Sequence, residues 1–255
     1  MPLEAIEPRR LYRQVADQLR GLIESGTYAV GDRLPTEREL SERLGISRPT
    51  VREALIALEV EGRVRIRVGS GIYVARPPAK KALVPAQTEG PFEVLRAREV
   101  VESAVAREAA NLRDEAGLAA LDTVLARMED GTHPSSETIA LDRAFHVAVA
   151  GLLGNAVLQR FVGELFDQRL TPYFARLSQY FENGESWRLA HGEHRQVRDA
   201  IASGNGDAAE AAMRHHLQES QKRFQIGFGE GNAEGVGPGR HRPRTPRKHQ
   251  REDTV

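Results

Sequence analysis

Residues 34–74 read LPTERELSERLGISRPTVREALIALEVEGRVRIRVGSGIYV. This stretch carries the signals for two short helices, a tight turn between them and a β-hairpin. Thr36 followed by Glu39 is a capping-box pattern, so it predicts that the first helix begins here. Gly45 is expected to end that helix, because glycine adopts the left-handed conformation of a helix terminus at little cost.

The second helix of the pair is predicted to follow at once. Ser47 is its expected N-cap, and Pro49 falls in the first turn, where a missing N–H group costs little. An apolar stripe through Val51, Leu55 and Leu58 would face the core. That orientation would leave polar and basic side chains exposed at the N-terminal end, the end that recognition helices present to bases. The exposed residues are expected to be Arg48, Thr50 and Arg52.

Residues 63–74 have the pattern of an arginine-rich hairpin. Arginine alternates with an aliphatic residue from 63 to 68, a period of two that is typical of a strand. Residues 69–71 read GSG and supply the turn, and residues 72–74 form the returning strand. The arginine face suits DNA phosphates. Each feature alone would also fit a small module with solvated arginines, but their order predicts a winged helix-turn-helix that binds DNA.

Length, charge and cysteine content limit the classes of protein to which this chain can belong. A chain of 255 residues is long enough for two domains, each with its own core. The absence of cysteine fits a reducing cytosol, and the lack of an apolar leader or membrane-length apolar run predicts a cytoplasmic protein without membrane contact. Formal net charge is zero, yet residues 91–230 carry 15 basic and 21 acidic side chains. DNA attraction must therefore come from clustered arginines.

The predicted fold is mainly α, in four segments. We expect a winged helix-turn-helix of three helices and a hairpin over 1–76, a linker over 77–90, an antiparallel bundle of six to seven helices over 91–229, and a disordered basic tail over 230–255. Pro172 should kink or split one bundle helix. Apolar periodicity and glycine positions predict helices at 11–25, 92–112, 114–130, 135–153, 155–182, 186–203 and 206–226.

Four residues of the predicted bundle have the character of metal ligands. Asp142 and His146 are four apart and share one helix face, while His194 and His216 lie on two later helices. Three imidazoles and a carboxylate can converge inside a bundle, and such a mixed set suits Zn²⁺, with Ni²⁺ or Mn²⁺ as alternatives. His191 is a rival to His194 on the same face. Alternatively, these histidines only form hydrogen bonds or caps.

Both predicted domains resemble known families. Residues 34–55 and 58–74 resemble the winged helix-turn-helix of GntR-family transcription regulators. The second domain resembles the ligand-sensing domain of the FadR subfamily, in the segments GPFEVLRAREVVESAVAREAA, LDRAFHVAVA and EHRQVRDAIASGNGDAAEAAMRHHL. Within that subfamily the chain is most similar to the hexuronate-utilisation repressors, in the segments EPRRLYRQVADQL, LEVEGRV, GSGIYV and GPFEVLRAR.

The resemblance implies a homodimer that binds a palindromic operator and releases it when a small carboxylate binds. The DNA contacts carried over by motif are Arg38, Ser47, Arg48, Thr50, Arg52 and, at the wing tip, Gly69. The family's metal ligands fall on Asp142, His146, His194 and His216. Arg98 matches a first-helix arginine that faces the effector, and Arg169 is a second candidate. Asn155 and Tyr173 are candidate partners of the effector's hydroxyl groups.

These features favour an effector-responsive transcriptional repressor whose effector is a sugar acid such as a hexuronate. The competing hypothesis is a metal-dependent hydrolase or isomerase that acts on a small carboxylate through a metal-activated water. It is disfavoured because no glutamate is placed as general base; Glu193 adjoins His194 but is expected to point off its face. An architectural DNA-binding protein is disfavoured by the acidic second domain.

Overall fold

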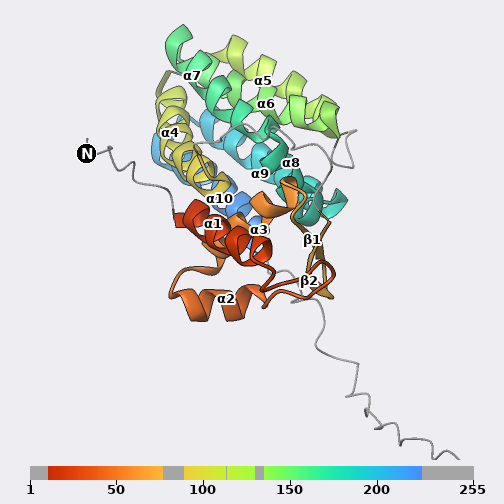
Figure 1. Cartoon of the computed structure of the whole chain (residues 1–255). Helices are drawn as coiled ribbons and strands as arrows, with labels where there is room; N and C mark the ends of the chain where they lie inside the picture. The colour runs from red at the N-terminus through yellow and green to blue at the C-terminus, as the bar shows by residue number, and fades with distance from the viewer. Residues whose placement is uncertain (1–10, 77–88, 113, 130–134, 226–255) are drawn as a thin grey trace, which may run out of the picture.

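The computed structural model describes residues 11–76, 89–112, 114–129 and 135–225 (Figure 1). The predicted basic tail and all but the last two residues of the predicted linker lie outside the described residues. In the described part, a small domain with one hairpin packs against a larger, all-helical domain, which confirms the predicted fold class.

The first domain has the helices and strands of a winged helix-turn-helix. They are α1 (Leu11–Glu24), α2 (Glu37–Leu44), α3 (Arg48–Val60), β1 (Val64–Arg67) and β2 (Gly71–Val74). The capping box of α2 is present, because the Thr36 hydroxyl accepts from the Glu39 N–H and the Glu39 carboxylate accepts from the Thr36 N–H. Gly45 adopts a left-handed φ of 65° after α2, and Ser47 caps α3, both as predicted.

The hairpin is antiparallel, with Val64 opposite Val74 and Arg67 opposite Gly71. Its inner face is apolar and buried, while Arg65 and Arg67 point to solvent, as the alternating pattern predicts. Val68 departs from that pattern: it lies in the turn and is 60% exposed, because pairing ends at Arg67.

The second domain contains seven α-helices and one short 3₁₀ helix in the described residues. They are α4 (Pro91–Leu112), α5 (Glu115–Glu129), α6 (Ser136–Gly151), α7 (Ala156–Asp167), η1 (Gln168–Leu170), α8 (Pro172–Phe181), α9 (Gly184–Ala202) and α10 (Gly206–Gln225). The predicted segment 155–182 is split as expected at Pro172, which occupies the first turn of α8 after the N-cap Thr171. Within the described residues, no helix is long and apolar enough to cross a membrane.

Helix α10 has extensive contacts with two other helices of this domain. It packs along α4 and α9, while α6 packs against α5 and α7. Their apolar faces form a core that includes Phe145, Val162, Val197 and Met213. Since α4, α6, α9 and α10 all meet around this core, polar side chains on their inner faces are brought together in the domain interior.

The two domains share a hydrophobic cluster. Leu55 of α3 belongs to the same buried cluster as Leu95 of α4, Phe174 of α8 and Phe224 of α10. The Tyr180 hydroxyl also lies 2.6 Å from a carboxylate oxygen of Glu59 on α3. The expectation of one separate core per domain is therefore corrected: α8 and α10 continue the apolar surface of α3.

A shared core makes the stability of the second domain depend on α3. Leu55 is fully buried, so Leu55→Ala should lower the free energy of unfolding by about 2–5 kcal/mol. The only tryptophan, Trp187, lies in the second domain and reports on that domain during urea unfolding. We expect the Trp187 fluorescence transition to move to lower urea.

The control for this prediction is Leu189→Ala, whose side chain is 57% exposed on α9 and should change stability by less than about 0.5 kcal/mol. If Leu55→Ala moved the circular dichroism transition but left the Trp187 transition in place, the domains would unfold independently.

Candidate metal centre and DNA-binding surface

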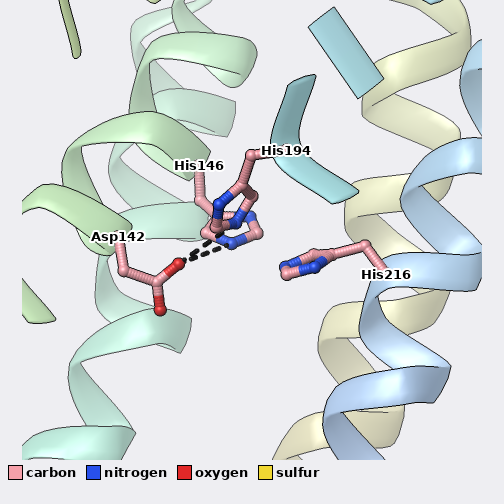
Figure 2. Close-up of side chains that lie close together, drawn as sticks. All are labelled: Asp142, His146, His194 and His216. Carbon is pink, nitrogen blue, oxygen red and sulfur yellow. Dashed lines mark ion pairs between the residues drawn. The ribbon is translucent and has the colours of Figure 1, made fainter. Parts of the chain in front are cut away.

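Four side chains from three helices converge in the interior of the second domain (Figure 2). Asp142 and His146 come from α6, His194 from α9 and His216 from α10. All four are buried, and their ligand atoms lie within 4.8 Å of one another. The structure thus brings together the four residues that the sequence identifies as candidate ligands.

The imidazoles are turned so that nitrogen faces the carboxylate. His146 Nε2 lies 3.4 Å and His194 Nε2 3.2 Å from Asp142 Oδ1. The ring of His216 lies 4.2 Å from that of His194, measured between centroids. His191, the rival of His194, lies outside the cluster: its Nε2 is 3.2 Å from the Leu125 carbonyl oxygen of α5.

Two further carboxylates contact the outer nitrogens of these histidines. Glu102 Oε2 lies 2.5 Å from His146 Nδ1, and Glu193 Oε2 lies 2.8 Å from His216 Nδ1. Sequence reasoning missed both contacts. Glu193 was expected only to point away from His194, and its partner is His216 of α10. Each contact joins two helices, so no spacing along the chain reveals it.

The electrostatics favour ionised carboxylates and, for His194 and His216, neutral imidazoles. Burial raises the pKa of Glu102, but Arg98 and His146 outweigh it and lower that pKa to about 2. The pKa of Asp142 is likewise held well below its usual value, against burial, by His146, His194 and Arg169. Burial lowers the pKa of His194 and of His216, most strongly for His216. Only His146 has a raised pKa, because Glu102 outweighs its burial.

The donor set fits a divalent metal ion. Carboxylate oxygen and neutral imidazole nitrogen are the forms that bind metals. Within the described residues, the Nε2 atoms of His146 and His194 are buried without a hydrogen bond of good geometry. Buried polar atoms normally have partners, and a cation between these nitrogens would satisfy them. The cluster can therefore hold a metal.

A small cavity adjoins the cluster. It has a volume of about 30 Å³, room for about two water molecules and less than a sugar acid occupies. Its lining includes Arg98, Asp142, Arg169, Trp187, His216 and Arg223. A larger ligand at this site would require the surrounding side chains or helices to move apart.

The cavity contains two of the four residues predicted to bind the effector. Arg98 and Arg169 line it, and Arg169 donates to Asp142 at 2.5 Å and to Glu182 at 2.6 Å. Asn155 does not line the cavity. Its side chain caps α7 by accepting from the N–H groups of residues 157 and 158. Tyr173 does not line it either, because it is buried in the shared core and its hydroxyl donates to the Glu53 carbonyl oxygen. The structure therefore places Asn155 and Tyr173 outside the lining of this cavity.

Six of the lining residues were not proposed from the sequence, among them Arg223 and Trp187. Arg223 is a basic residue near a helix C-terminus, a common placement that does not by itself indicate a binding site. Trp187 is buried and borders the cavity. Its indole N–H has no hydrogen-bond partner in the described residues, which leaves a donor beside the cavity.

Most of the predicted DNA-contacting residues lie at the surface of the first domain. The Arg38 side chain is 70% exposed, and that of Arg48 is 38% exposed. Ser47 is exposed, and its hydroxyl accepts a hydrogen bond from the backbone N–H of Thr50. Thr50 itself is half-buried. Gly69 is exposed at the wing tip with a φ of 73°, a conformation that suits glycine.

Arg52 is the exception, because it is only 1% exposed. Its guanidinium donates to the Glu37 carboxylate at 2.6 Å and, through Nη1, to the Phe224 carbonyl oxygen at 2.5 Å. Phe224 lies in the last turn of α10, where carbonyl groups lack partners within the helix and attract cations. The expected exposure of Arg52 is therefore corrected: the second domain covers it.

Comparison with known proteins agrees with this architecture. Residues 11–74 match the family described as "Bacterial regulatory proteins, gntR family", and residues 93–219 match the FCD domain. The Uxu operon regulator of Haemophilus influenzae is 34% identical over 221 residues, which cover 85% of this chain and 83% of that protein. The Exu regulon transcriptional regulator of Escherichia coli K12 is 36% identical over 229 residues, covering 86% of each.

Among solved structures, Streptococcus agalactiae GntR is 26% identical with a TM-score of 0.42, covering 83% of this chain and 99% of that one. The two sequence relatives span most of both chains and are named as regulators, which agrees with the resemblance found in the sequence. The chain therefore belongs to the GntR family, with an FCD domain as its second domain, and is a DNA-binding transcriptional regulator rather than an enzyme.

Proposed function

We propose that this regulator is a homodimeric repressor that binds a palindromic operator and releases it when a hexuronate-class carboxylate binds beside the Asp142 cluster. The observation that carries the proposal is that one helix serves both domains. Helix α10 supplies His216 and Arg223 to the cavity, and the Phe224 carbonyl at its end holds Arg52 of α3. The names of the relatives, regulators of a uxu operon and an exu regulon, support the hexuronate class.

A divalent ion, Zn²⁺ before Ni²⁺ or Mn²⁺, would be held by the Asp142, His146, His194 and His216 cluster. Zn²⁺ is favoured because three nitrogen donors and one oxygen donor match its usual tetrahedral set. When bound, the ion would supply positive charge that favours an anionic effector. The buried side chains at the site are then matched in charge to an acid rather than to a neutral sugar.

The protein's own groups also favour a carboxylate with hydroxyl groups. Three arginines line the cavity, and Nη2 of Arg98 is buried without a hydrogen-bond partner in the described residues. The unpartnered indole N–H of Trp187 offers a second donor. A carboxylate would form a charge-assisted pair with Arg98, and a hydroxyl would accept from Trp187. Because the cavity has a volume of only about 30 Å³, binding must expand it.

Expansion of the cavity would act on DNA binding through α10. In the arrangement described, Arg52 contacts Glu37 and Phe224 and cannot reach a base. Operator reading by Arg52 requires the C-terminal turn of α10 to move away from α3. The effector would bind more tightly to the arrangement in which Arg52 is held, and this difference in affinity would shift the population away from the DNA-bound form. Two winged helices, fixed in a dimer, would read the two operator halves.

Metal binding by the buried cluster can be tested with neighbouring histidines. His216→Ala should abolish stoichiometric metal after dialysis, because it removes one of four ligands from a closed site. The matched control is His215→Ala, since the His215 side chain is 55% exposed one position away on the same helix. Metal content per chain is measured by elemental analysis. Equal metal content in the two variants would contradict the assignment.

Effector class can be tested by thermal stability. Galacturonate, glucuronate or fructuronate at about 100 times its Kd should stabilise the folded protein by about 2.7 kcal/mol and raise Tm. EDTA should reduce the shift, because the bound cation contributes charge at the site. Galactose, which lacks the carboxylate, serves as the control ligand. A galactose shift as large as the galacturonate shift would show that the acid group is not recognised.

DNA recognition can be tested with Arg48→Ala, measured as fluorescence anisotropy on an operator selected from a random DNA pool. Loss of an arginine that reads a base should cost about 1–3 kcal/mol of operator binding, while effector binding stays unchanged. Arg160→Ala is the control, because that side chain is 66% exposed on α7 of the other domain. If both variants bound the operator as tightly as the unsubstituted protein, Arg48 would not read DNA.

A further inference from the structure

The outer nitrogen of each of two cluster histidines lies beside a glutamate carboxylate, in a hydrogen bond for His216 and in a close contact without hydrogen-bond geometry for His146. His146 Nδ1 lies 2.5 Å from Glu102 Oε2, while the other oxygen, Oε1, accepts from Arg98 Nε at 2.6 Å. His216 Nδ1 lies 2.8 Å from Glu193 Oε2, and Oε1 accepts from Arg223 at 2.9 Å. Two arginine–carboxylate–imidazole chains therefore approach the cluster, one from α4 and one from α9 and α10.

This arrangement suits histidines that bind a metal through Nε2 and keep the proton on Nδ1. An ionised carboxylate is only an acceptor, so the histidine nitrogen beside it must carry hydrogen. When Nε2 gives its lone pair to a metal, the proton of each ring would therefore reside on Nδ1, beside the glutamate. For His146 that lone pair is on the nitrogen that lies 3.4 Å from Asp142 Oδ1, at the centre of the cluster. The carboxylates would thus favour the tautomer that can bind a metal.

His194 lacks such a partner. Its Nδ1 is buried without a hydrogen bond in the described residues, and its ring packs against Phe145 with centroids 4.4 Å apart. Its orientation therefore comes from packing. Two of the three imidazoles are positioned by charge, and both of the arginines that hold those charges also line the cavity.

We propose that Glu102 and Glu193 are positioning residues that hold His146 and His216 with Nε2 toward the metal, and that Arg98 and Arg223 fix these carboxylates from the cavity side. The proposal rests on the metal site of the proposed function. It adds that an acid bound by Arg98 or Arg223 would act on a carboxylate that orients a metal ligand. Effector and metal would therefore be linked through the protein as well as by direct attraction.

The test is metal affinity in Glu102→Gln and Glu193→Gln, measured on apo protein by competition with a chromophoric chelator for Zn²⁺. Each substitution keeps the size of the side chain and removes its charge. Loss of such a partner is expected to weaken metal binding 10–100-fold. The Co²⁺-loaded variants should also show a changed visible absorption spectrum, because the ring of the affected histidine is no longer held in place.

The matched control is Glu99→Gln. Glu99 is 3% exposed on α4, three residues before Glu102, and accepts from Gln218 and Gln221 of α10 without contacting a cluster histidine. It should bind Zn²⁺ as tightly as the unsubstituted protein. A loss of affinity in this control equal to that in Glu102→Gln would overturn the proposal, because general loosening of α4 would then explain the effect.

The outcomes distinguish a failure of the proposed metal site from a failure of the proposed positioning role. If the unsubstituted protein binds no Zn²⁺, Ni²⁺ or Mn²⁺, the metal site of the proposed function is wrong, and the positioning role falls with it. If the unsubstituted protein binds metal and both Gln variants bind it within twofold with an unchanged Co²⁺ spectrum, only the positioning role is wrong. Weaker binding and an altered spectrum in Glu102→Gln and Glu193→Gln, with Glu99→Gln unchanged, support the proposal.

Discussion

The rest of the structure depends on the pairing of charges buried inside the second domain. Asp142, Glu102, Arg98 and Arg169 are each 8% exposed or less. Taking such groups out of water is costly unless every one finds an opposite charge or a hydrogen-bond partner. Arg169 joins Asp142 to Glu182, and Arg98 joins Glu102. Arg169 thereby connects α6 to η1 and the end of α8, and Glu102 of α4 reaches α6 through His146, so moving one helix alone would leave a buried charge without its partner.

The same constraint explains why the buried cluster and the DNA-binding domain are mechanically connected. Helix α10 contributes one candidate ligand, one cavity arginine and the carbonyl oxygen that accepts from Arg52. It is also the helix on which Phe224 enters the core shared with α3. A displacement of α10 at the cavity would therefore reach α3 through close packing and through a hydrogen bond to a buried guanidinium, both of which resist gradual deformation.

Much of the fold could be predicted from short patterns. The capping box at Thr36, the left-handed Gly45, the N-cap Ser47 and the helix break at Pro172 all depend on contacts within a few residues of the chain. The pairing of Asp142 with His146 follows from helix geometry in the same way. Helix boundaries predicted from periodicity differ from those observed by only a few residues, except where η1 separates α7 from α8.

The predictions that needed correction concern side chains whose partners are distant in the chain. Arg52 was expected at the surface, but it is 172 residues away in sequence from the carbonyl that covers it. Tyr173 was expected at the effector site, but its hydroxyl reaches the backbone of α3. Glu102 and Glu193 were not identified because their histidine partners lie on other helices. Periodicity determines which face of a helix is apolar, but not which helix covers that face.

The sequence by itself determined the winged-helix architecture and the helical nature of the second domain, because these follow from local capping and hydrophobic periodicity. It identified the four clustered residues as candidate ligands but left His191 as a rival of His194. Only the tertiary structure decided that Arg52 is covered, that the two domains share a core and that carboxylates lie behind His146 and His216. The physical reason is that burial and charge pairing are set by the packing of whole helices, and that packing depends on contacts that no local pattern contains.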